Sequence, residues 1–105
     1  MLLTLRVTVP SDRTGAVRAL FENCPGTAHL AVLPGASVRS PGDLVVADVA
    51  RESADELVAG LRALGVDDDG AISMEAVDAA VSRRAEEAER AASWCPTWPS
   101  SPSRR

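Results

Sequence analysis

The sequence contains no lysine, tyrosine or glutamine, and Phe and Trp together make up only 3% of its 105 residues. RNA-recognition modules stack bases on aromatic side chains of their strands, but here Phe21 falls on a predicted helix and both tryptophans lie near the end of the chain. All eleven basic residues are arginines, and the net charge is −4. Nucleic-acid binding needs clustered basic residues to neutralise phosphates, so the composition argues against a nucleic-acid partner.

Cysteine and histidine are also scarce. The two cysteines, Cys24 and Cys95, lie far apart and form no CxxC motif, and His29 is the single histidine. We therefore expect no disulfide framework, and a reducing, cytoplasmic setting is predicted. The opening stretch MLLTLRVTVP has an early arginine and too short an apolar run for a signal peptide. No apolar run approaches the ~20 residues that cross a bilayer, so the chain as given is predicted to be soluble.

The stretch GVDDDGAISMEAVD, residues 65–78, is similar to the middle of an EF-hand calcium loop. With Gly70 at loop position 6, Asp67 and Asp69 fall on ligand positions 3 and 5. Position 1 is then Gly65, and position 12, which should be a bidentate glutamate, is Ala76. Because the first and last ligands are missing, we predict an exposed acidic turn after a helix and no metal site.

Hydrophobic periodicity divides the chain up to Val77 into strands and helices. Strand patterns cover 2–9, 27–33, 43–50 and 71–77, and helix patterns cover 11–24 and 53–64. In the last strand, Ile72 and Met74 are expected to point inward. An alternative for that segment is a helix from Met74, because EAVDAAVSRRAEEAERAA is rich in helix formers.

Capping signals predict where the helices begin and end. Ser11 or Asp12 is expected to cap the first helix. The buried stripe of this helix is predicted to be Val17, Leu20, Phe21 and Cys24. The second helix is expected to start at Ser53, which has capping-box spacing to Glu56, and Gly65 suits the position just past its end.

The predicted order β-α-β-β-α-β is typical of the ferredoxin-like α+β sandwich. Its antiparallel sheet would have the strand order 4-1-3-2, with both helices on one face. This domain is predicted to cover residues 1–81. Residues 82–105 are expected to form a linker-like tail, first a solvated helix with an alanine stripe and then a disordered segment rich in proline and serine.

The catalytic and metal-binding variants of this fold are not supported by the residues. A copper-chaperone-like site needs CxxC in the first strand-helix loop, but that loop, VPSDRTG, has no cysteine. An acylphosphatase-like site needs an asparagine on the sheet, but Asn23 ends a helix. His29 is interpreted as a structural imidazole in an apolar strand, and Cys24 as part of a buried stripe. We therefore predict no catalytic residue and no cofactor.

Four polar residues remain as ligand-binding candidates. Asp12 and Thr14 lie in or beside the first strand-helix loop. Asp48 interrupts an apolar strand and should face the same side as Arg6 on the neighbouring strand, either as a cross-strand ion pair or as a polar contact for a ligand. The sheet face away from the helices would also carry apolar residues such as Leu44 and Val46, which predicts contact with a second copy or another domain.

Several stretches together resemble the soluble N-terminal region of bacterial membrane proteins in domain-of-unknown-function family 389. They are LLTLRVTVPSDRTGAVRAL, GDLVVADVARESADELVAGLRALGV, and DGAISMEAVDAAVS with AEEAERAA after it. The resemblance covers residues 1–92 and implies a ferredoxin-like, cytosolic domain that precedes several transmembrane helices. The chain departs from the family pattern after Ala92, where SWCPTWPSSPSRR suggests a frameshift or an early stop in the coding DNA.

The leading interpretation is a noncatalytic regulatory or assembly domain, detached here from its membrane part. Its expected partners are a second copy, bound through the open sheet face, or a membrane domain. The alternative is a standalone small-molecule sensor like amino-acid-binding regulatory modules of the same topology. Its ligand would touch Asp12, Thr14 or Asp48 beside a dimer edge.

Overall fold

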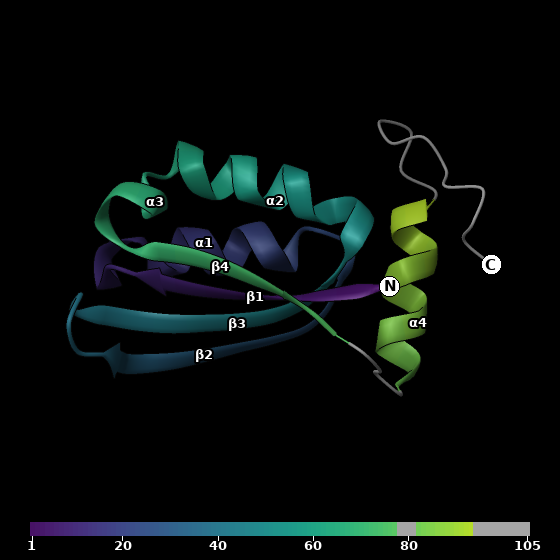
Figure 1. Ribbon diagram of the computed structural model, residues 1–105, viewed down its shortest axis with the longest axis horizontal. Coiled ribbons are helices and arrows are strands. Elements are labelled where there is room, and N and C mark those ends of the chain that lie inside the picture. The colour runs from purple at the N-terminus through teal and green to yellow at the C-terminus, as the bar shows by residue number, and fades with distance from the viewer. Residues whose placement is uncertain (78–81, 94–105) are drawn as a thin grey trace.

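The computed structural model describes residues 1–77 and 82–93. It has an α+β architecture around a four-stranded antiparallel sheet with the order β2-β3-β1-β4 (Figure 1). The elements are β1 (Leu2–Val9), the 3-10 turn η1 (Ser11–Arg13), α1 (Thr14–Glu22), β2 (Thr27–Ser37), β3 (Gly42–Ala50), α2 (Arg51–Ala63), α3 (Val66–Asp69), β4 (Ala71–Ala76) and α4 (Arg83–Ser93). The predicted strand order is therefore confirmed.

The core lies between the sheet and the helices α1 and α2, which cover the same face (Figure 1). On β1 the side chains of Leu5, Val7 and Val9 are fully buried, whereas Arg6 between them is exposed, as the alternation predicts. Apolar side chains of the helices close this core: Val17 and Phe21 from α1, and Leu57 and Leu61 from α2.

The starts of both core helices differ from the prediction. Ser11 and Asp12 lie in the 3-10 turn η1, and α1 begins at Thr14 with no side-chain cap. The helix α2 begins at Arg51, directly after β3, so Ser53 lies inside it and is buried instead of capping it. Short-range capping signals were overridden here because β3 runs without a loop into α2. The prediction for the other end is confirmed, since Gly65 follows α2 with a φ of 74°.

The two edge strands differ from their predicted form. The strand β2 continues past Pro34 to Ser37, with a register irregularity between Leu33 and Ser37. A proline is tolerated there because β2 is an edge strand. On β4 the side chain of Ile72 packs against the core, but Met74 is 53% exposed. Met74 lies opposite Leu5 and so faces the helix side of the sheet, as predicted, but its side chain stays exposed at this edge strand.

The helix α4 lies across one end of the sheet (Figure 1). It buries three alanines, Ala85, Ala88 and Ala92. The first two of them pack with Leu2 of β1 and Ala28 of β2. The amino group of Met1 also forms an ion pair with Glu89 of α4. The prediction of a solvated, linker-like helix is therefore wrong for residues 83–92, because the alanine stripe packs on the sheet. The predicted domain boundary at residue 81 and the predicted disordered segment 94–105 lie outside the described residues.

Across residues 1–77 and 82–93, the helices are too short or too polar to span a lipid bilayer.

Gly26 packs closely against α2, so we expect a larger residue at this position to destabilise the fold. A Cβ on Gly26 would lie 2.9 Å from the Cβ of Ser53 and would collide with its hydroxyl, whereas a Cβ on Gly15 would meet nothing within 4 Å. We expect Gly26→Ala to lower the free energy of unfolding by about 1–3 kcal/mol through overpacking. Gly15→Ala, the matched control inside α1, should raise it by about 0.4–1 kcal/mol. Urea denaturation measures both, and equal effects would contradict the tight contact.

Candidate functional site

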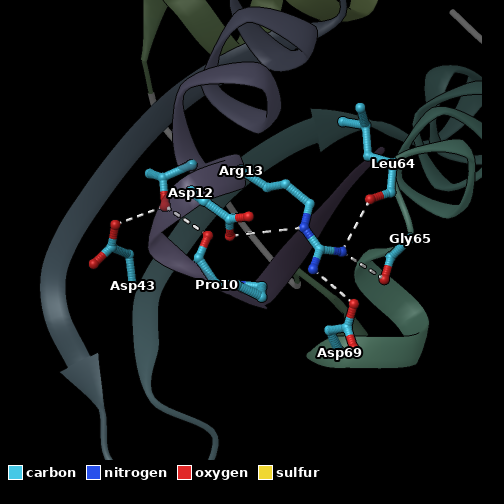
Figure 2. A network of polar contacts seen from close by, with 8 residues as sticks. Pro10, Asp12, Arg13, Asp43, Leu64, Gly65 and Asp69 are labelled. Atoms are coloured by element: carbon cyan, nitrogen blue, oxygen red, sulfur yellow. Dashed lines mark hydrogen bonds and ion pairs between the residues drawn. The ribbon is translucent and has the colours of Figure 1, made fainter.

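The first strand-helix loop is organised around Arg13, which connects the loop to the end of α2 (Figure 2). Its guanidinium donates hydrogen bonds to the carbonyl oxygens of Leu64 and Gly65, each at 3.2 Å. It also bonds the Asp69 carboxylate at 2.6 Å and lies 3.8 Å from a carboxylate oxygen of Asp12. The hydrogen bond that Arg13 donates to Asp69 is the main reason that the pKa of Arg13 is raised. Arg13 therefore bonds the Leu64 carbonyl just past the end of α2, and it shares the Gly65 carbonyl with the backbone N–H groups of Asp68 and Asp69.

The acidic run that is similar to a calcium loop forms the short helix α3. Asp69 pairs with Arg13, and Asp67 lies 3.7 Å from the guanidinium of Arg62. Within the described part of the chain, no group of three or more His, Cys, Asp or Glu side chains is arranged to hold a metal ion. The acidic run is thus built into contacts with arginines.

A second polar contact fastens the loop to the hairpin between β2 and β3. The hydroxyl of Thr14 donates a 2.6 Å hydrogen bond to the Asp43 carboxylate, and the Gly35 backbone N–H donates one at 2.8 Å (Figure 2 draws Asp43). Both bonds favour the ionised carboxylate, and the bond from Thr14 is the larger cause of the lowered pKa of Asp43. Thr14 thus has a structural partner that sequence reasoning did not identify.

The four predicted ligand-binding residues do not come together. Asp12 and Thr14 lie at the loop end, whereas Asp48 lies toward the α4 end of β3. The β1 residues opposite Asp43 and Asp48 are Val9 and Thr4. Thr4 and Val9 are five residues apart on β1, so Asp48 lies about 16 Å from Asp43 along the sheet at ~3.3 Å per residue.

Asp48 and Arg6 share the open sheet face, but the cross-strand ion pair expected between them is wrong. Asp48 accepts a 2.7 Å hydrogen bond from the hydroxyl of Thr4, which lies directly opposite. Arg6 lies opposite Val46 instead, and its guanidinium is 3.5 Å from Glu75 on β4. Sequence patterns place both residues on the same face but do not give the register that selects their partners.

His29 lies in a polar row at the α4 end of the open sheet face. It is directly opposite Asp48, and its Nε2 is 3.1 Å from the hydroxyl oxygen of Ser82. His29 was interpreted as a structural imidazole in an apolar strand. Its side chain is exposed on the sheet and not buried in the core. Ser82 was missed as a partner, although a serine just before a helix pattern is a recognised capping signal.

This row does not make an activated nucleophile. The Ser82 hydroxyl oxygen accepts the Ala85 backbone N–H at 2.9 Å and so caps α4. The Asp48 carboxylate is engaged by Thr4, and among the described residues no hydrogen bond joins Asp48 to His29. An activated nucleophile needs its base oriented by a third group, which is not provided here. These polar residues therefore hold the start of α4 against the sheet.

A groove of about 720 Å³ opens between α1, the edge strand β2 and the start of α4. Its apolar lining includes Phe21, Leu30 and Val32, and its polar lining includes Arg18, Glu22 and Arg84. Arg18 and Glu22 are one helical turn apart on α1 and form an exposed ion pair at 3.4 Å. The size is that of a ligand pocket, but none of the four predicted ligand residues is among its lining residues.

The open sheet face carries two strips of different character. An apolar strip lies on β2 and β3 and consists of Ala31, Leu33, Leu44 and Val46, of which Leu33 is 43% exposed. A polar strip lies beside it on β1 and β4 and consists of Arg6, Thr8, Ser73 and Glu75. The helix α4 covers only the end of this face near Leu2 and Ala28. The apolar strip is therefore left half-buried or exposed.

Comparison with known proteins adds no relative. The chain matches no protein-family model, no curated protein sequence and no solved structure.

The Asp43 contacts predict a pH dependence of stability. Because the folded state lowers the pKa of Asp43, its contribution is present above the unfolded value of about 3.9 and is lost as pH falls through the folded value. We expect Asp43→Asn to be less stable than the wild type at pH 7, with the difference shrinking toward pH 3. Urea denaturation at stepped pH measures this. Asp55→Asn, on the exposed side of α2, is the charge-matched control, and a pH-independent difference would contradict the contact.

The Ser82 cap on α4 predicts how two substitutions at this residue change the stability of the fold. Ser82→Ala should lower the free energy of unfolding by about 1 kcal/mol because the Ala85 N–H loses its acceptor. Ser82→Asp keeps an acceptor at that position and should retain most of the stability. Thermal and urea unfolding compare the three proteins. If Ser82→Ala were as stable as the wild type, the cap would not hold α4 on the sheet.

Proposed function

We propose that this chain is a noncatalytic regulatory or assembly domain of the ferredoxin-like type. The order of β1, α1, β2, β3, α2 and β4, with both core helices on one face, supports this fold assignment. The resemblance to the N-terminal region of domain-of-unknown-function family 389 supplies the setting, a cytosolic head that works beside a membrane domain. In this proposal the domain acts by binding other protein surfaces.

The observation that carries the proposal is the apolar strip on the open sheet face. Leu44 and Val46 on β3 are half-buried, and Leu33 beside them on the edge strand β2 is 43% exposed. Contiguous apolar surface of this kind marks protein contact sites. The neighbouring polar strip, with Arg6 and Glu75, would give such a contact its orientation.

The assembly function has stronger support than the small-molecule alternative. That alternative placed the ligand near the first strand-helix loop, touching Asp12, Thr14 or Asp48, but Asp48 lies about 16 Å along the sheet from the loop. Thr14 and Asp48 also already have hydrogen-bond partners within the fold. An enzymatic function has no oriented nucleophile or base among the described residues.

Sedimentation over a wide concentration range tests the open face as a self-association surface. We expect the wild type to associate reversibly, and Val46→Glu to weaken that association because it places a charge in the apolar strip. Ala59→Glu adds the same charge on the exposed side of α2 and should change nothing. A strictly monomeric wild type at high concentration would contradict self-association and leave the membrane domain as the proposed partner.

A further inference from the structure

The sheet has two edges, and they are protected differently. The edge strand β4 is six residues long and carries Glu75. The edge strand β2 is eleven residues long. An edge strand presents unpaired backbone N–H and C=O groups that a further strand can pair with, and charged residues or short length discourage this. Of the two edges, β2 is the one suited to strand addition.

The middle of β2 lacks the usual protection. Its ends carry irregularities. One register shift lies between Thr27 and His29, and a second lies between Leu33 and Ser37, in the segment that contains Pro34. Between them the stretch His29–Leu33, with the sequence HLAVL, contains no Asp, Glu, Lys or Arg. This stretch pairs regularly with β3 on its inner side. The side chains of residues 29–33 thus bring no carboxylate, ammonium or guanidinium group to this edge, and the start of α4 lies beside its His29 end.

The groove beside β2 has an apolar floor that a second strand would cover. Leu30 and Val32 point toward α1 and pack against the core, but both are only half-buried. Together with Phe21 they line the groove. If a second strand were paired to β2, its own side chains on this face would complete their burial. The edge and the groove therefore favour the same occupant, an extended strand with apolar residues.

Charges on α1 favour a second copy of this chain as that occupant. Arg18 and Glu22 both line the groove, so they lie on the side of α1 that faces out over the β2 edge. Their side chains are 61% and 53% exposed. A two-fold axis at the β2 edge would bring α1 of each copy together in antiparallel directions. Arg18 of each copy would then face Glu22 of the other, since residues that meet across such an axis do so reciprocally.

We propose that two copies of this chain pair through β2 in antiparallel fashion, centred on His29–Leu33. The contact joins two four-stranded sheets into one continuous sheet. Both copies keep α1 on the same face, where Arg18 and Glu22 form two ion pairs across the axis. The open faces take no part and become one wider surface. This inference uses a different surface from the proposed function and does not depend on it.

Charge-reversal variants test the pairing without disturbing the core. Arg18→Glu places two acidic residues on each copy's α1, and Glu22→Arg places two arginines there. We expect each variant alone to dimerise about tenfold or more weakly than the wild type, because like charges meet across the axis. An equimolar mixture of the two should recover a tight heterodimer, and the double variant Arg18→Glu/Glu22→Arg should recover the homodimer. Sedimentation velocity measures all five samples.

Two controls separate this contact from other associations. Arg62→Glu reverses an exposed charge on α2, away from the edge, and should dimerise like the wild type. Adding Val46→Glu to both single variants should leave heterodimer formation unchanged, because the open face is not used. A monomeric wild type, single variants that associate like the wild type, or a mixture that stays monomeric would each overturn the proposal. Loss of heterodimer only with Val46→Glu would place the contact on the open face instead.

Discussion

The central position of β1 is the constraint on which the rest of the structure depends. This strand pairs with β3 on one side and β4 on the other, and its inward side chains Leu5, Val7 and Val9 are fully buried. A shift of one residue in either register would turn these side chains to the open face and bring Arg6 into the core. The burial of one face of β1 therefore sets the registers of both its neighbours and the face on which α1 and α2 pack.

The two ends of the sandwich are closed by different means. At the loop end, Arg13 and Asp43 join the first loop to α2 and to the β2-β3 hairpin through charge-assisted hydrogen bonds. At the other end, α4 packs its alanines over Leu2 and is capped by Ser82, which also contacts His29. Most of the polar groups that could have marked a reaction site are engaged in holding these ends. The open sheet face and the β2 edge remain accessible to a binding partner.

Both of these surfaces are consistent with the assembly role that we propose. Pairing along β2 would extend the sheet and leave the open face free, so that face could bind a further copy or a different protein. The self-complementary placement of Arg18 and Glu22 favours this pairing, because it supplies orientation at the edge, where Leu30 and Val32 alone would not. In a membrane-associated setting, such a pair would present two equivalent open faces to the protein that carries them.

Sequence alone predicted the four strands, the two core helices, the sheet order and the inward face of β1, because the period-2 and 3.6-residue patterns reflect which side chains are buried. It also predicted the glycine that ends α2. Only the tertiary structure decided the partners of the polar residues: Asp48 with Thr4, Thr14 with Asp43, and His29 with Ser82. It also decided that α4 packs on the sheet and that β2 extends past Pro34. Each of these depends on strand register or on contacts between distant segments, which local patterns do not encode.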